Sequence, residues 1–68
     1  METGKVKWFN YKKGYGFIKP NQGEKDIFVH ITALQAAKLR SLDEDETVLY
    51  DLKEENGKIC ATNLKKSL

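Results

Sequence analysis

Two short stretches of the chain place a ring-bearing side chain at every second residue. They are Lys13-Gly14-Tyr15-Gly16-Phe17-Ile18 and Asp26-Ile27-Phe28-Val29-His30. Because alternate side chains of a β-strand point to opposite faces of the sheet, the two rings of each stretch are expected to share a face. The positions between the rings hold glycine, isoleucine and valine, which suit a buried face. The face that carries the rings is therefore either a second core or an exposed stacking surface.

The length of the chain favours the exposed surface. A chain of 68 residues forms one small domain and buries only about 60% of the surface that its unfolded form exposes. A second core would need another layer of structure over the rings, and too little chain remains to build it. The aliphatic side chains can fill a single core, which we expect to contain Val6, Ile18, Ile27, Val29, Leu34, Val48, Leu52, Ile59 and Leu64.

The rest of the sequence predicts further short strands. Alternation of polar and apolar residues indicates strands over about residues 5–10, 15–19, 26–30, 47–54 and 58–64. The connections among the first three strands are short, which favours antiparallel neighbours there, because parallel neighbours need crossovers of a dozen or more residues. We therefore predict an all-β fold, a closed five-stranded antiparallel Greek-key β-barrel (OB-fold) with a short helical turn after the third strand.

The segments between the strands carry recognisable signals. Gly14 suits a turn with positive φ, and Asn56-Gly57 is typical of a tight hairpin. Thr32 is a candidate N-cap for the helical turn. The acidic run Asp43-Glu44-Asp45-Glu46 is expected to be a solvated loop, and Tyr11 and Tyr50 are expected to pack at the periphery.

Basic residues gather in the part of the chain that carries the rings. The formal net charge is only +2, yet residues 1–31 hold six lysines against three acidic residues. Cations that follow phosphates, together with rings that stack on bases, are typical of proteins that bind single-stranded nucleic acid. A merely solvated lysine surface is the alternative, and the interleaving with rings favours binding. Lys7 and Lys13 are the main candidates, and the secondary ones are Lys5, Lys12, Lys19 and Lys58.

Other classes of function find little support. Cys60 is the only cysteine and His30 the only histidine, so neither an internal disulfide nor a four-ligand zinc site can form. We find no paired carboxylates, no nucleophile–base combination and no phosphate-binding loop, and expect no enzyme and no cofactor. We find no signal peptide and no run of transmembrane length, and expect a cytoplasmic monomer without a membrane or metal partner.

Taken together, these motifs resemble the bacterial cold-shock proteins over essentially the whole chain, residues 1–68, as a single cold-shock domain. Gly4-Lys5-Val6-Lys7-Trp8-Phe9-Asn10 matches the opening strand of that family. The two ring-bearing stretches resemble its first and second ribonucleoprotein motifs. An RNA-recognition motif shares a similar first motif, but places it after the other one and needs two helices.

The resemblance implies a protein that binds single-stranded RNA and single-stranded DNA with little sequence demand. It implies an RNA chaperone that melts weak secondary structure and so affects translation and transcription at low temperature. Bases would stack on Trp8, Tyr15, Phe17, Phe28 and His30. Lys7 and Lys13 would lie at the phosphates, with Phe9 and Asn10 nearby. The alternative is a small β-barrel protein-interaction module whose rings contact a polypeptide.

The chain also departs from the pattern of that family. Ile31 and Leu39 stand where many members carry aromatic residues, and both are kept as candidate binding residues. Because aliphatic side chains stack less well than rings, we expect weaker binding at that end of the surface. The resemblance also places Val6 in the core and Trp8 on the ligand face. Strict alternation would put both on one face, so the first strand needs a bulge between them.

Overall fold

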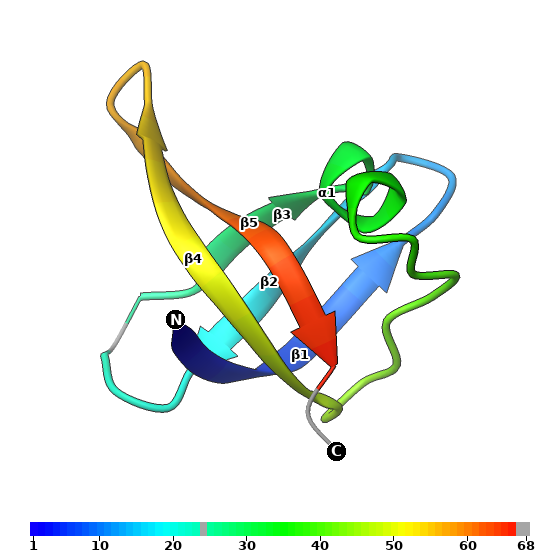
Figure 1. The fold of residues 1–68 in the computed structure, drawn as a ribbon, viewed down its shortest axis with the longest axis horizontal. Coiled ribbons are helices and arrows are strands. Elements are labelled where there is room, and N and C mark those ends of the chain that lie inside the picture. The colour runs from blue at the N-terminus through cyan, green and yellow to red at the C-terminus, as the bar shows by residue number, and fades with distance from the viewer. Residues whose placement is uncertain (24, 67–68) are drawn as a thin grey trace.

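Five β-strands and one short helix make up the part of the chain that the computed structural model describes, residues 1–23 and 25–66. In chain order they are β1 (Glu2–Asn10), β2 (Tyr15–Pro20), β3 (Ile27–His30), α1 (Ile31–Ala36), β4 (Thr47–Glu55) and β5 (Lys58–Lys66) (Figure 1). Every predicted strand is present. The largest differences lie at the outer ends of β1 and β5, which extend further than the alternation of side chains indicated.

The strands close into a barrel in the order β1-β2-β3-β5-β4, with β4 pairing back onto β1. This confirms the predicted fold class. One pairing differs from the expected antiparallel arrangement, because β3 and β5 run parallel, with Phe28 opposite Cys60. The reason is parity. Strand directions cannot alternate all the way round a ring with an odd number of strands, so a closed five-stranded barrel contains at least one parallel pair.

One apolar core fills the barrel. It consists of Val6, Ile18, Val29, Leu34, Leu42, Val48, Tyr50, Ala61 and Leu64, and none of the described polar or charged residues is buried with them. Most of the predicted aliphatic residues are therefore in place, and Ile27 packs against this core while remaining half-buried. Tyr50 was expected at the periphery, and that prediction is wrong. It follows Val48 by two residues on the inward face of β4 and is fully buried.

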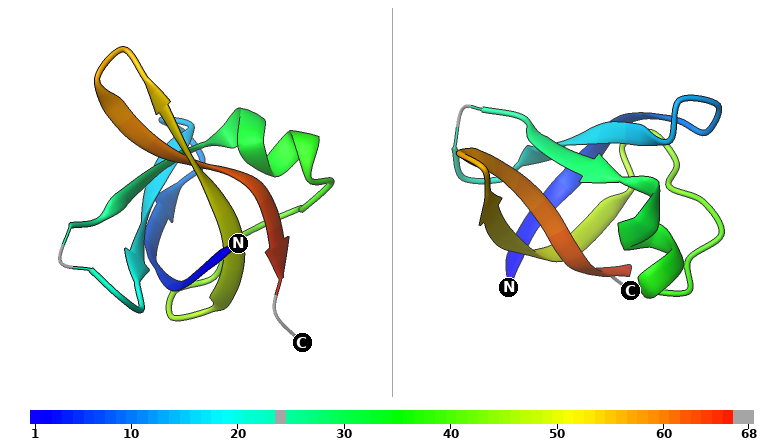
Figure 2. Two further views of the ribbon diagram at one scale, coloured as in Figure 1. Left: turned by 60° about the vertical axis from the view of Figure 1, so that its left-hand side comes forward. Right: turned by 90° about the horizontal axis from the view of Figure 1, so that it is seen from above.

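Two predicted core residues, Leu52 and Ile59, are not in the core. Their exposed fractions are 48% and 50%. Both lie in the outer half of the β4–β5 hairpin, which projects beyond the barrel and so has no opposing layer (Figures 1 and 2). The hairpin turn itself is as predicted: Asn56 and Gly57 both have positive φ, 53° and 77°, as a type I′ turn requires.

Helix α1 begins directly after β3, without an intervening loop. Its N-cap is His30 and not Thr32, because His30 keeps the extended backbone of the strand (φ −95°, ψ 152°). The Nδ1 atom of its imidazole accepts a hydrogen bond from the backbone N–H of Thr32 at 3.2 Å. The first buried side chain of the helix is Leu34, which anchors it to the core.

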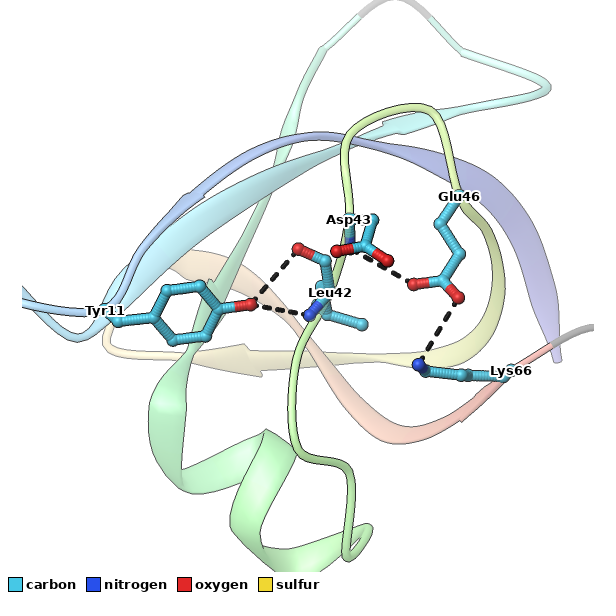
Figure 3. A network of polar contacts seen from close by, with 5 residues as sticks. All are labelled: Tyr11, Leu42, Asp43, Glu46 and Lys66. Carbon is cyan, nitrogen blue, oxygen red and sulfur yellow. Dashed lines mark hydrogen bonds and ion pairs between the residues drawn. The ribbon is translucent and has the colours of Figure 1, made fainter.

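The connection from α1 to β4 is fixed to the barrel by backbone hydrogen bonds of Asp45 and Glu46 to Val6 and by side-chain contacts. Figure 3 shows the side-chain contacts. The hydroxyl of Tyr11 accepts a hydrogen bond from the N–H of Leu42 at 2.7 Å and donates one to the Leu42 carbonyl oxygen at 3.2 Å. The carboxylate of Glu46 accepts from the N–H of Asp43 and pairs with the ammonium of Lys66 at 3.4 Å. The acidic run is thus a loop, as predicted, but its last residue is half-buried in an ion pair.

Candidate nucleic-acid interface

A bulge in β1 brings Trp8 to the outer face of the barrel. Val6 lies opposite Ile18 and Trp8 lies opposite Phe17, so β1 advances by two residues where β2 advances by one. Lys7 is the extra residue. Val6 therefore stays in the core while Trp8 faces outward beside Phe17, which confirms the bulge that the family resemblance implied.

Strand pairing brings five rings together on this face. Tyr15 lies opposite His30 and Phe17 lies opposite Phe28. The ring centroids are 5.3 Å apart for Trp8 and Phe17, 5.7 Å for Tyr15 and Phe28, and 6.3 Å for Phe28 and His30. These separations are those of aromatic pairs in contact. We call the group of Trp8, Tyr15, Phe17, Phe28 and His30 the ring surface.

The ring surface is not a second core. Its four aromatic side chains are half-buried and His30 is exposed. The residues between them along β2 and β3, namely Gly16, Ile18 and Val29, are buried on the opposite face. The rings are thus supported from beneath and open to solvent from above, as chain length favoured.

Gly16 allows β1 and β2 to approach each other closely behind the rings. A Cβ atom added here would overlap the carbonyl oxygen of Trp8 and lie 2.7 Å from the Cα of Phe9. Both of these atoms belong to the backbone and cannot give way without separating the strands. A residue without a side chain is therefore required at this position.

The turn between β1 and β2 is built by Asn10. Its side-chain oxygen accepts a hydrogen bond from the N–H of Lys13 at 3.0 Å, and its carbonyl oxygen accepts one from the N–H of Gly14 at 2.8 Å. Gly14 has the positive φ expected of it, 81°. Its carbonyl oxygen accepts from the N–H of Ile31 at 2.9 Å, which ties this turn to the start of α1. Asn10 thus fixes the backbone of the turn at Lys13, two residues before Tyr15.

One of the two main candidate lysines is already paired. The ammonium of Lys7 lies 2.8 Å from the carboxylate of Asp26, just before β3. Sequence reasoning gave Asp26 no role beside Lys7, because nothing in the spacing of the two residues indicates that they meet. Lys13 is exposed and forms no ion pair with any residue in the described part of the chain.

Three further candidates lie apart from the ring surface. Phe9 is on the inward face of β1, where it packs against the core with its ring 4.8 Å from that of Tyr11. Leu39 also packs against the core. Ile31 is the first residue of α1 and lies half-buried near Gly14. These three side chains do not extend the array of rings.

A groove continues from the ring surface between α1 and the β4–β5 hairpin. Its volume is about 680 Å³, and Phe28 and His30 form one of its walls. Lys53, Lys58 and Cys60 line it from the hairpin. Of these, only Lys58 was a candidate, and a weak one. The other two could have been found only from the β3–β5 pairing, which sequence spacing does not indicate.

The structure also bears on metal binding and on membrane insertion. Among residues 1–23 and 25–66 there is no group of three or more side chains arranged to hold a metal ion. The described part of the chain has no helix long and apolar enough to cross a membrane.

Comparison with known proteins agrees with this geometry. A family model described as the 'Cold-shock' DNA-binding domain matches residues 2–67. A cold shock-like protein CspA from Rickettsia bellii is 53% identical over 63 residues, which cover 93% of this chain and 90% of that protein. The cold shock protein CspA of Rhizobium meliloti is 48% identical over 96% of this chain and 97% of its own length. The cold shock-like protein CspG of Escherichia coli K12 is 45% identical over 91% of this chain and 89% of its own length. The chain belongs to the cold-shock domain family, whose members bind nucleic acids and are not enzymes.

Proposed function

We propose that this cold-shock domain binds single-stranded RNA and single-stranded DNA by stacking unpaired bases on its ring surface. The observation that carries the proposal is the contiguous array of rings across β1, β2 and β3, open to solvent and supported by the core. Every base has a flat face that can stack on such rings, so binding needs little sequence information. In a duplex these faces are covered by neighbouring bases, and we expect duplexes to bind poorly.

Stacking is expected to supply more of the affinity than phosphate contacts do. The net charge is only +2, and Lys7 is partly neutralised by Asp26. On single strands, the affinity falls with salt with a slope of about −0.7 per phosphate neutralised. Contacts from a few lysines such as Lys13 therefore predict a shallow dependence on salt.

An RNA chaperone activity follows from preference for unpaired strands. A protein that binds only the open form of an RNA shifts the pairing equilibrium toward that form by mass action. Weak hairpins open and strong ones stay closed, because stacking is worth about 1–3 kcal/mol per base. We propose that this is how the protein affects translation and transcription at low temperature, where RNA structure is more stable. We also propose that it acts as a cytoplasmic monomer and a single domain.

The fluorescence of Trp8, the only tryptophan, provides the direct test. The protein is titrated with a pyrimidine oligonucleotide of about seven bases, and with the same sequence in a duplex. We expect quenching by the single strand and much weaker quenching by the duplex. Failure of every RNA and DNA to change the signal would reject this function and favour the protein-interaction module.

The chaperone activity is measured separately with an RNA hairpin of low stability that carries a fluorophore and a quencher. Addition of the protein is expected to open the hairpin at temperatures below its melting point. Phe28→Ala should open it far less at the same concentration. A protein that binds single strands but leaves the hairpin closed would retain the binding function and lose the chaperone proposal.

A further inference from the structure

His30 is part of the ring surface and is also the N-cap of α1. Its ring lies in the ring surface, 6.3 Å from Phe28 and opposite Tyr15 across β2 and β3. Its side chain is also the N-cap of α1, where Nδ1 accepts the backbone N–H of Thr32 at 3.2 Å. The side chain that would stack on a base is therefore the one that caps the helix.

The cap determines where the proton of the neutral imidazole lies. A backbone amide can only donate a hydrogen bond, so Nδ1 must present a lone pair to Thr32. A proton on Nδ1 would point an N–H group at another N–H group and leave a helix amide without a partner. The hydroxyl of Thr32 lies 3.0 Å from Nδ1 and fits either arrangement, because it can rotate to donate or accept. The hydrogen bond from the Thr32 amide therefore determines the tautomer of His30, with the proton on Nε2.

We infer that the backbone amide of Thr32 is a positioning group for nucleotide binding, which holds the His30 ring in place and keeps its proton on Nε2. In the described part of the chain no hydrogen bond reaches Nε2. The ring also lines the groove beside Phe28. The ring surface therefore presents an N–H donor at this edge, directed to an acceptor such as a base carbonyl or a phosphate oxygen.

Holding the ring in place before binding should increase the affinity for a nucleotide by a measurable amount. When a mobile side chain becomes immobilised on binding, the binding free energy is ordinarily less favourable by about 0.5–1.5 kcal/mol. This lowers the affinity by a factor of about 2–10. A ring that the helix already holds avoids this loss. The assignment of the proton stands on the free protein alone, whereas the effect on affinity rests on the proposed function.

The test begins with the protonation state of the free protein. Because His30 is the only histidine, long-range ¹H–¹⁵N spectra of the imidazole contain the signals of one ring. The pH is raised until the imidazole signals no longer change, and in that neutral form we expect Nε2 to be protonated and Nδ1 to be a lone-pair acceptor. A proton on Nδ1, or a mixture of both forms, would overturn the inference whether or not the protein binds nucleic acid.

Two variants at Thr32 then separate the amide from the side chain. Thr32→Ala removes the hydroxyl and keeps the amide, so the imidazole should still be a single tautomer with its proton on Nε2. Thr32→Pro removes this N–H, which belongs to the first-turn amides without a partner inside the helix; the favoured position for proline is one residue earlier, at Ile31. Thr32→Pro should produce a mixture of tautomers and weaken binding of a seven-base thymidine oligonucleotide by about 2–10-fold.

The outcome remains decisive if Thr32→Pro does not fold. A synthetic chain with an ester in place of the Thr32 amide removes the same N–H without adding a ring, and the same spectral change is expected. His30→Asn is the complementary control, because asparagine caps helices well but cannot stack. It should keep α1 and lose affinity. Equal affinity for the wild type and the ester chain would reject the positioning role of the amide, while the wild-type titration itself tests the proposed function.

Discussion

Gly16 lies where the backbones of β1 and β2 approach each other too closely to admit a side chain. The backbone of β1 occupies the space that a Cβ atom at this position would need. We expect Gly16→Ala to destabilise the fold by more than about 3 kcal/mol, the upper end of ordinary overpacking, because only backbone could move to relieve the overlap. Chemical denaturation measures this loss.

Gly57→Ala is the matched control for that measurement. Its Cβ would meet nothing within 4 Å, although its φ of 77° is strained for alanine. The cost of a left-handed conformation is about 1–2 kcal/mol. If Gly16→Ala costs no more than Gly57→Ala, close approach of the strands is not the reason for the glycine.

Phe17 and Phe28 provide the residue-scale test of the ring surface. Replacing either with alanine should weaken binding of a single-stranded oligonucleotide by about 1–3 kcal/mol, or about 5- to 150-fold, since one stacked base loses its partner. The stability should change only modestly, because neither ring belongs to the core. Leu52→Ala, which truncates an exposed side chain outside the ring surface, should leave the affinity unchanged. A loss of several kcal/mol of stability would show that the rings are core after all.

Tyr50 gives the molecule a dependence on alkaline pH. Burial, and secondarily the charge of Glu2, raises the pKa of Tyr50 above its ordinary value of 10.0. Above about pH 10 the unfolded chain therefore releases this proton while the folded chain retains it. The stabilisation is complete below pH 10 and is lost as the pH rises toward the folded-state pKa. Tyr50→Phe should lose less stability than the wild type between pH 9 and 11.

The comparison isolates Tyr50, because every other side chain is common to both proteins. Tyr15→Phe, on the ring surface, is the control and should follow the wild type. Parallel loss of stability in the wild type and in Tyr50→Phe would contradict the assignment.

At the residue scale, the sequence predicted correctly those positions whose face is determined by the two-residue alternation of side chains along a strand. Alternation placed Tyr15, Phe17 and Phe28 on one face, and the limited chain length placed that face at the surface. It failed for Tyr50 and Leu52, because their burial depends on where the hairpin leaves the barrel. That point is set by the closure of the whole sheet, which alternation within one strand does not reveal.

At the scale of elements, an ion pair that joins the bulge of β1 to the residue just before β3 should limit binding. Asp26 neutralises Lys7 at the edge of the ring surface, with exposed side-chain fractions of 33% and 54%. Asp26→Asn should raise the affinity for single strands and make its dependence on salt steeper by about 0.7, the value for one more phosphate contact. Because the pair is largely solvated, stability should change by less than about 1 kcal/mol.

Glu44→Gln makes the same change in net charge in an exposed loop. It should affect affinity much less and leave the salt slope unchanged. If both variants bind equally more tightly, the effect is one of net charge and not of a released lysine.

The elements themselves were largely predictable, and the irregular positions between them were not. The bulge at Lys7 was found only because Val6 and Trp8 had been assigned to opposite faces. The N-cap was assigned to Thr32 because threonine is a common cap, whereas His30 performs it here. The N-cap preferences of amino acids are averages over many helices. They do not describe a helix such as α1, which begins directly after a strand.

At the scale of the whole molecule, closure of the barrel rests on its one parallel pair. Strand number alone would have predicted such a pair, although not its place between β3 and β5. Antiparallel pairing elsewhere is more extensive: β2 and β3 are in register from Tyr15 and His30 to Ile18 and Ile27. Between β3 and β5, the register in the described part of the chain is the single pair Phe28 and Cys60.

The β3–β5 pairing, which we call the seam, should be the first strand pairing to open in the folded protein. Local opening breaks the fewest strand hydrogen bonds there, so the amides of β3 and β5 that face each other should exchange with deuterium faster than those between β1 and β2. A nucleotide in the groove would touch Phe28 on one edge and the hairpin on the other, so binding should slow this exchange. Slower exchange at the seam than between β1 and β2 in the free protein would contradict this. The bound single-stranded nucleic acid would then also hold β3 and β5 together and so keep the barrel closed.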